Sequence, residues 1–528
     1  MRRLERFASW LMVILPPALL GAMTLFAFAP FALWPLALVS LTLFFGLVDT
    51  ASDSRRAALV GWGYGIGYFA AATHWIYISL HDFGGLPAVV SVLVLTLLAA
   101  FLALYPALAA WGARRLAGRQ RAALLLLALP CCWLLTEWLR GWLLTGFPWS
   151  SIGYTQIPDG PLAGFAPVVG IYGVGGLLAW LAGALAWLVG RRVDRGSALA
   201  MLAGTVIVSG GLLLRPISWT APKGNPLRVA LLQGGIPQNQ KWGNDDLVFN
   251  LRTYAALLKE AQGDLLLMPE TALPIFLHEA PGYFTDPELG RQAEARYPVL
   301  PDDYLEHLIG MARAKGAALI SGAPRFTRDG RHYLNGAVLL TGAGWPSYYK
   351  SHLVPFGEYV PLRGLIGGLY AYFDMPLDDF SAGAPVQPPL RVRDQRIATN
   401  ICYEDIFGEE LLANAANATI LFNLSNLAWF DGSVALAQHG QIAQARSLET
   451  GRPSLLVTKT GTTAVVDPRG HYQAKLPERV QAVLSASVQG YDGTTPYMRL
   501  GNWPAVLLGA LGAVFAFISG RRVARARA

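Results

Sequence analysis

The sequence predicts a bundle of membrane-spanning helices joined to one large α/β domain, in which a layered sheet is covered by helices. The composition is the first observation behind this prediction. Of 528 residues, 53% are hydrophobic and only 14% are charged, whereas soluble domains carry roughly a quarter charged residues. The second is that long apolar runs fill the first part of the chain and recur near its end. The third is the stretch between them, residues 216–498, which has ordinary polar composition and alternating strand and helix patterns.

Eight apolar runs are each about long enough to cross the hydrocarbon core of a membrane. They cover residues 8–27, 31–48, 57–80, 86–112, 122–142, 162–190, 198–214 and 503–519. The first run does not resemble a cleaved signal peptide, because no small-residue cleavage site follows and a second run begins almost at once. We therefore predict a seven-span bundle over 1–215, an external domain over 216–498, and a last span with a basic tail over 499–528.

Arginines cluster in every second connection between these runs and at both ends of the chain. They are Arg2, Arg3, Arg6, Arg55, Arg56, Arg114, Arg115, Arg119, Arg121, Arg191, Arg192, Arg195, Arg521, Arg522, Arg525 and Arg527. Because basic residues mark the cytoplasmic side of a membrane protein, both termini are predicted to be cytoplasmic and the α/β domain to face outward, into the periplasm of a diderm bacterium. The same clusters account for much of the net charge of +8, so we predict no nucleic-acid partner.

Two features within the bundle invite interpretation. Glycines at 61, 63, 65 and 67, and again near 170–176, predict close helix packing. Glu137 and Arg140 lie one helical turn apart in the fifth run, and such a pair marks either a functional site or a buried salt bridge. The aromatic connection that follows, residues 145–150, is either an interfacial anchor or a lipid-facing rim.

The pattern of residues 216–498 predicts an α/β domain. Strands are predicted at 227–233, 264–270, 317–322, 335–340, 396–402, 418–424 and 455–460. Helical spacing occurs at 304–314. Strands that alternate with helices favour a layered sheet covered by helices.

Cys402 is the only cysteine outside the membrane runs. It ends a predicted strand, a position that brings a side chain to the rim of a sheet. An unpaired cysteine in an oxidising compartment suggests a nucleophile, but most free cysteines are small buried hydrophobes, and position alone leaves both possibilities open. No cysteine or histidine spacing suggests a metal site, and no cofactor is predicted.

Glu270 and Lys350 also follow predicted strands. Taken singly, each would be an ordinary surface residue. Together with Cys402 they supply a carboxylate, an ammonium and a nucleophile, a set that suits acyl transfer. The carboxylate can take the thiol proton, and the ammonium can stabilise first the thiolate and then the oxyanion of a tetrahedral intermediate.

The strings around these residues resemble the nitrilase superfamily, whose triad is Glu-Lys-Cys. They are Met268-Pro-Glu-Thr, Lys350-Ser-His-Leu-Val-Pro-Phe-Gly-Glu-Tyr-Val-Pro and Ile401-Cys-Tyr-Glu. Their longer forms resemble one membrane-embedded branch, the apolipoprotein N-acyltransferases. Further matches to that branch are Gln238-Asn-Gln-Lys-Trp, Trp429-Phe, Ala445-Arg-Ser-Leu-Glu-Thr-Gly-Arg-Pro, Thr495-Pro-Tyr-Met-Arg and Gly146-Phe-Pro-Trp. The resemblance covers nearly the whole chain and implies a nitrilase-like α-β-β-α sandwich for the external domain.

The resemblance also implies roles for the site residues. Glu270 would be the general base, Lys350 the stabiliser of thiolate and oxyanion, and Cys402 the nucleophile. Glu358, in the Phe-Gly-Glu-Tyr string, would assist at the site.

Three further residues match positions that the family uses around the nucleophile and the acyl chain: Trp242, Tyr403 and Glu404. Each also has a structural interpretation, Trp242 as a packing aromatic and the other two as neighbours that hold the loop. The chain departs from the family pattern at Leu427, where many relatives have aspartate in a loop expected to face substrate.

The implied reaction moves an acyl chain from a membrane phospholipid, of the phosphatidylethanolamine type, through a thioester on Cys402. The acceptor would be the N-terminal α-amine of the diacylglyceryl-cysteine of an apolipoprotein. The family further implies a monomer in the bacterial inner membrane. The alternatives are a membrane-tethered nitrilase-type amidase, which shares the triad, a transporter with an accessory domain, and an inactive scaffold that binds lipoproteins. A transporter should carry several ionisable residues in its spans, and a scaffold has no need of an intact triad.

Overall fold

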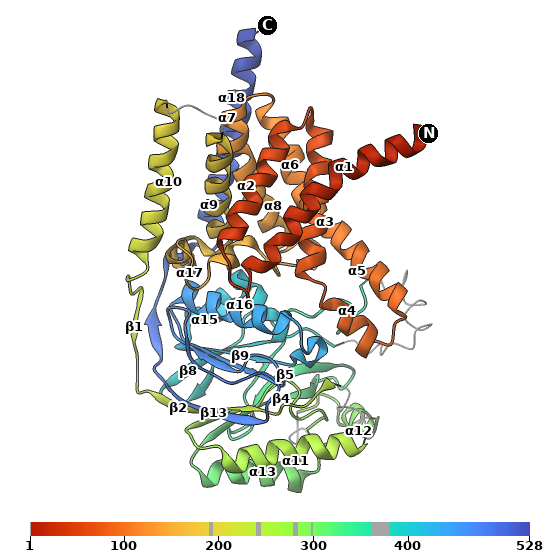
Figure 1. The fold of residues 1–528 in the computed structure, drawn as a ribbon. Coiled ribbons are helices and arrows are strands. Elements are labelled where there is room, and N and C mark those ends of the chain that lie inside the picture. Colours follow the sequence, from red (N-terminus) through yellow and green to blue (C-terminus); the bar gives the residue numbers. More distant parts are fainter. Residues whose placement is uncertain are drawn as a thin grey trace. The chain divides into compact units, whose positions relative to one another are not determined.

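The computed structural model describes residues 2–189, 194–238, 244–277, 283–296, 299–361 and 380–527 (Figure 1). The chain forms two compact units. The helical unit comprises Met1–His81, Pro87–Ile217 and Thr495–Ala528. The α/β unit comprises Ser218–Thr494 and the short segment Asp82–Leu86. We describe each unit by itself.

The helical unit has a helix at each of the eight places where an apolar run occurs. These helices are α1 (Arg2–Met23), α2 (Pro35–Thr50), α3 (Ser54–Ala72), α5 (Ala88–Leu102) continued by α6 (Leu104–Ala117), α8 (Leu129–Arg140), α9 (Ala166–Leu188), α10 (Arg195–Leu214) and α18 (Trp503–Arg527). Shorter helices are α4 (Ile76–Ile78), α7 (Arg121–Ala123) and α17 (Pro496–Leu500). Within the described residues, five helical segments are long and apolar enough to cross a membrane. Two further apolar helices, at Met12–Ala27 and Pro35–Thr50, are shorter.

The glycines of α3 allow its neighbours to approach closely. A Cβ atom on Gly67 would lie 1.8 Å from the carbonyl oxygen of Ala18 in α1, and one on Gly61 would lie 2.4 Å from that of Pro106 in α6. Real Cβ atoms do not come so close, so only glycine fits these contacts. The predicted close packing is confirmed here.

Glu137 and Arg140 form a buried salt bridge with 3.6 Å between Oε1 and Nη2. The Arg140 guanidinium also donates to the carbonyl oxygens of Phe147 and Trp149, the latter at 2.9 Å. Glu137 Oε1 accepts from the backbone N–H of Ile152 at 2.8 Å. The pair therefore braces the aromatic connection after α8, which supports the salt-bridge interpretation. Trp149 is buried and so is not an exposed anchor.

The described residues of the α/β unit form two six-stranded sheets and a two-stranded one. The first sheet has the order β13-β2-β3-β4-β5-β6, the second β12-β11-β10-β9-β8-β7, and β1 pairs with β14. The strands are β1 (Thr220–Pro222), β2 (Leu227–Gln233), β3 (Leu265–Leu267), β4 (Ala318–Phe326), β5 (Tyr333–Leu339), β6 (Ser347–Tyr349), β7 (Leu390–Val392), β8 (Gln395–Ile401), β9 (Ile420–Ser425), β10 (Ser454–Thr458), β11 (Ala464–Val466), β12 (Tyr472–Lys475), β13 (Ala482–Val488) and β14 (Tyr491–Gly493). The three central strands of each large sheet, β2-β3-β4 and β8-β9-β10, run parallel.

The two large sheets pack face to face, with helices on both outer faces (Figure 1). Leu231 and Leu267 of the first sheet share one buried cluster with Ile401 and Phe422 of the second. The outer face of the first sheet packs against α11 (Asn244–Glu260) and α13 (Asp302–Ala314), and that of the second against α15 (Gly408–Ala416) and α16 (Ala435–Thr450). Another helix, α12, covers Pro287–Arg296. The predicted α-β-β-α sandwich is confirmed.

The two predicted strands that lead to Glu270 and Cys402 extend beyond the ends of the observed ones. β3 ends at Leu267, and β8 ends at Ile401. Cys402 has a φ of +55° and begins a 3-10 turn, η8 (Cys402–Ile406). A left-handed residue cannot continue a strand, so the strand stops one residue before the predicted nucleophile.

Candidate active site

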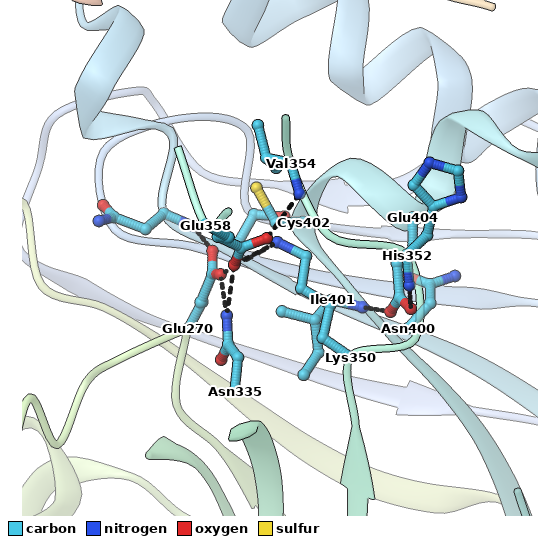
Figure 2. A network of polar contacts seen from close by, with 12 residues as sticks. Glu270, Asn335, Lys350, His352, Val354, Glu358, Asn400, Ile401, Cys402 and Glu404 are labelled. Atoms are coloured by element: carbon cyan, nitrogen blue, oxygen red, sulfur yellow. Dashed lines mark hydrogen bonds and ion pairs between the residues drawn. The ribbon is translucent and has the colours of Figure 1, made fainter. Parts of the chain in front are cut away.

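Three strand ends bring the predicted triad together (Figure 2). Glu270 follows β3, Lys350 follows β6, and Cys402 follows β8. Lys350 Nζ lies 3.8 Å from Glu270 Oε1. Residues that lie far apart in the sequence meet because strand ends of the two packed sheets share one rim.

The backbone at Cys402 is held in an unusual conformation. A positive φ at a residue other than glycine costs of the order of 1 kcal/mol and persists only where the surroundings enforce it. Here the Cys402 carbonyl oxygen accepts from Asn423 Nδ2 at 3.2 Å and lies 3.4 Å from His439 Nε2. These buried partners hold the turn that presents the thiol.

Both oxygens of the Glu270 carboxylate are fixed. Oε1 accepts from Asn335 Nδ2 at 2.7 Å, and Oε2 accepts from the backbone N–H of Asn426 at 2.7 Å. Glu270 is buried, with 6% of its surface exposed. The sequence analysis missed Asn335 and Asn426. The only signal for Asn335 was an amide inside an otherwise apolar strand.

Lys350 lies between two carboxylates. Its Nζ donates to Glu358 Oε1 at 2.9 Å, and Glu270 lies on its other side. Burial lowers the pKa of Lys350, but the negative charges of Glu358 and Glu270 outweigh burial, so the net pKa is well above its usual value. The ammonium is therefore charged at every physiological pH and available to stabilise negative charge.

The Cys402 thiol experiences opposing influences. Burial raises its pKa, the negative charge of Glu270 raises it further, and the positive charge of Lys350 lowers it. The net pKa is well above that of a free cysteine. The resting Cys402 side chain is thus a thiol, and a thiolate forms only when a base takes the proton. The negative charge of Glu270 acts on the thiol, so Glu270 is the candidate for that base.

Glu358 holds the lysine in place. Its Oε1 accepts from Lys350 and, at 3.2 Å, from Asn335 Nδ2, while Oε2 accepts from the backbone N–H of Val354 at 2.8 Å. Asn335 therefore links Glu358 to Glu270, and the two carboxylates flank one ammonium (Figure 2).

Comparison with known proteins identifies the family of this chain. The model of the apolipoprotein N-acyltransferase N-terminal domain matches residues 20–184, and that of the carbon-nitrogen hydrolases matches residues 228–497. An apolipoprotein N-acyltransferase of Chromobacterium violaceum is 46% identical over 94% of this chain and 92% of its own. That of Nitrosomonas europaea is 41% identical over 95% and 97%, and that of Neisseria meningitidis 38% identical over 95% of each chain.

The chain belongs to the apolipoprotein N-acyltransferase family. It is accordingly an acyltransferase of the nitrilase superfamily and a multi-pass protein of the bacterial inner membrane. The hydrolase, transporter and scaffold alternatives give way to this assignment. Among solved structures, an amidase of the nitrilase superfamily from Nesterenkonia AN1 is 22% identical, with a TM-score of 0.34, over 53% of this chain and 95% of its own.

Glu404 lies in the Ile401-Cys-Tyr-Glu motif and stabilises the backbone beside Cys402 and Lys350. Its buried carboxylate accepts hydrogen bonds from residues on both sides of Lys350 in the chain and from the strand before Cys402. The donors are the backbone N–H groups of Ile401 (2.6 Å), Ser351 (2.7 Å) and His352 (3.1 Å) and the hydroxyl of Tyr348 (2.9 Å). Burial raises the pKa of Glu404, and the hydrogen bonds from Ile401 and Ser351 only partly offset it. This arrangement matches the loop-holding interpretation.

The other two residues predicted to support the site are Tyr403 and Trp242. The Tyr403 ring packs edge-on against His352 and Phe407, with centroids 5.8 and 5.1 Å away. Trp242 lies outside the described residues. Leu427, where the chain departs from the family pattern, is buried with 1% exposed. The expectation that this loop faces substrate stays a prediction.

Proposed function

We propose that Glu270, Lys350 and Cys402 carry out a two-step transfer of an acyl chain from a phospholipid to an apolipoprotein. The observation that supports this most is the buried contact of one ammonium with two carboxylates beside a protonated thiol. Such a site can move a proton and stabilise an oxyanion without a metal or cofactor.

In the first step, Glu270 takes the thiol proton as Cys402 Sγ attacks the ester carbonyl carbon of the phospholipid. The oxyanion that forms is stabilised by the Lys350 ammonium. The carbon–oxygen bond to glycerol then breaks, and Glu270 returns the proton to the leaving oxygen. The products are a lysophospholipid and a thioester on Cys402.

In the second step, the α-amine of the diacylglyceryl-cysteine attacks the thioester carbonyl carbon. Glu270 accepts a proton from the amine, the carbon–sulfur bond breaks, and the proton passes to Cys402 Sγ. The product is an amide, and the enzyme is restored. Water must be excluded while the thioester persists.

We further propose a phosphatidylethanolamine-like donor, a monomeric enzyme, and no nucleic-acid partner. The alternating arginine clusters support an orientation with both termini cytoplasmic and the α/β unit in the periplasm.

Mass spectrometry of the intact protein tests the two-step route. After incubation with phospholipid and no acceptor, we expect the native chain to gain the mass of one acyl group, labile to hydroxylamine. Cys402→Ser should gain no such group, whereas Cys131→Ser, which changes a cysteine of α8, should behave as the native chain. Adding a diacylated lipopeptide should discharge the acyl group onto the peptide amine. A native chain that never gains an acyl group from any phospholipid would refute the thioester intermediate.

A further inference from the structure

A cavity of about 630 Å³ lies in the α/β unit. This volume is within the range of small-molecule sites, roughly 300–1,000 Å³. Its described lining residues are Tyr283, Arg325, Thr327, Arg328, Leu334, Gly344, Trp345, Ser347 and Tyr349. None of them belongs to the catalytic site described above.

This cavity lies on the opposite face of the first sheet from the catalytic lysine. Arg325 of β4 pairs with Leu334 of β5, and the next residue of β5, Asn335, holds Glu270. Tyr349 of β6 lines the cavity, and the next residue, Lys350, points into the catalytic site. Because successive side chains of a strand point to opposite faces, the sheet separates the two sites.

The floor of the cavity is a buried guanidinium held between aromatic rings. Arg325 is 4% exposed, and its Nη1 donates to Ser347 Oγ at 3.3 Å. Its Cζ lies 5.5 Å from the ring centroid of Tyr283 and 5.6 Å from that of Trp345. The exposed Arg328 lies 5.9 Å from the same Tyr283 ring. Two guanidinium groups thus share one aromatic wall.

The two charged side chains among the described lining residues are Arg325 and Arg328. None of the described lining residues is acidic. The nearby Asp329 is already engaged, because its carboxylate accepts from the Thr327 hydroxyl at 2.5 Å and from the Arg331 backbone N–H at 3.1 Å. A cavity with two guanidinium groups favours an anion, and guanidinium matches the geometry of phosphate oxygens.

We propose that this cavity binds a glycerophosphoryl group, either as a free glycerophosphate or as the head group of a phosphatidic-acid-like lipid. A phosphate monoester carries a charge of about −1.5 to −2 at neutral pH, and its oxygens accept charge-assisted hydrogen bonds from guanidinium groups. The volume exceeds the needs of a bare phosphate, and the rings of Tyr283 and Trp345 offer surface for the glycerol part. The site lies apart from Cys402, so its occupancy does not depend on the acyl-transfer steps.

Calorimetric titration of the full-length protein in detergent tests this proposal. The probes are glycerol 3-phosphate, a short-chain phosphatidic acid, and glycerate as the matched carboxylate. We expect one or both phosphate probes to bind and glycerate to bind at least about tenfold more weakly. Arg328→Gln and Arg325→Gln should each weaken phosphate binding about tenfold or more, as loss of a charge-assisted hydrogen bond requires. Arg331→Gln, an exposed change on the same turn, should leave binding unchanged.

The outcomes separate the sources and can overturn the proposal. Binding of glycerol 3-phosphate alone identifies a soluble ligand, and binding of the lipid alone identifies a head group. Failure of both phosphate probes, equal binding of glycerate, or binding unaffected by Arg328→Gln would overturn it. Because Arg325 is buried, acyl-enzyme formation at Cys402 serves as the check that each variant is folded.

Discussion

The carboxylates of Glu270 and Glu358 lie on either side of the Lys350 ammonium, and the Asn335 amide donates to both. Two negative charges around one positive charge leave the group negative before the thiol is counted. Burial of the thiol, together with that surplus of negative charge, keeps Cys402 protonated. The site therefore depends on proton transfer during attack and does not store a thiolate, which also limits its reaction with oxidants between turnovers.

This electrostatic arrangement predicts opposite effects of two substitutions on Cys402 reactivity. Glu270→Gln removes a charge that raises the thiol pKa, so the apparent pKa should fall and alkylation by iodoacetamide near pH 8 should become faster. Acyl transfer should nevertheless fall by about 10² or more, because the base is lost. Lys350→Met removes the charge that lowers the thiol pKa, so alkylation should become slower.

The measurement is the rate of Cys402 alkylation from about pH 6 to about pH 10, followed by peptide mass spectrometry. Only the thiolate reacts, so a faster or slower rate over this range reports the direction in which the apparent pKa has moved. Cys402→Ser gives the background from the two bundle cysteines, and Glu260→Gln, a change at the end of α11, controls for a general loss of charge. A shift in the same direction for both site variants would contradict the electrostatic account.

At the scale of elements, the position of α3 in the bundle is fixed by close contact with the backbones of two neighbouring helices. Its glycines face α1 and α6 at distances that no side chain can occupy. Helix association within a membrane relies on such packing, since lipid tails are as apolar as leucine. Glycine in a helix costs about 1 kcal/mol relative to alanine. In α3 the close packing against α1 and α6 offsets this cost.

Gly67→Ala should therefore destabilise the protein, although alanine is the better helix former. Its Cβ would meet the Ala18 carbonyl oxygen, so we expect a fall in Tm of several degrees, corresponding to overpacking of about 1–3 kcal/mol. Gly46→Ala in α2 is the matched control, because nothing lies within 4 Å of its added Cβ. Thermal unfolding in detergent measures both, and equal Tm values would contradict the packing account.

The elements that the sequence predicted and those that it missed differ in physical character. The strands around Glu270 and Cys402 were predicted because each is a short apolar run that a polar residue ends. Helix α16 was not predicted, since it buries polar residues such as Gln438, Gln441 and Arg446 on several sides and has no apolar period. The left-handed turn at Cys402 and the bridge from Asn335 depend on distant neighbours, which no local pattern records.

At the scale of the whole molecule, orientation follows from charge. The basic connections predict which side of the membrane each segment faces, and the helices occur where the apolar runs predict them. A reaction between two lipid-anchored substrates explains why membrane helices and a catalytic sandwich belong to one chain.

Labelling of single cysteines tests this orientation. In a variant with all three native cysteines replaced by serine, we expect Asp303→Cys, at the start of α13, to react with a membrane-impermeant maleimide in intact spheroplasts. Ser52→Cys, between α2 and α3, should react only after lysis. Both positions are exposed, so access to the reagent depends on the side of the membrane. The reverse pattern would mean that the positive-inside assignment is wrong.

The short segment Asp82–Leu86 belongs to the α/β unit although it lies between helices of the other unit. There the Phe83 ring meets Trp429 edge-on, with centroids 6.0 Å apart. Residues 218–494 expressed alone would therefore lack part of their own unit and leave Trp429 without this neighbour. Exchanging residues 1–217 between two relatives would therefore also exchange a piece of the catalytic unit, the segment Asp82–Leu86.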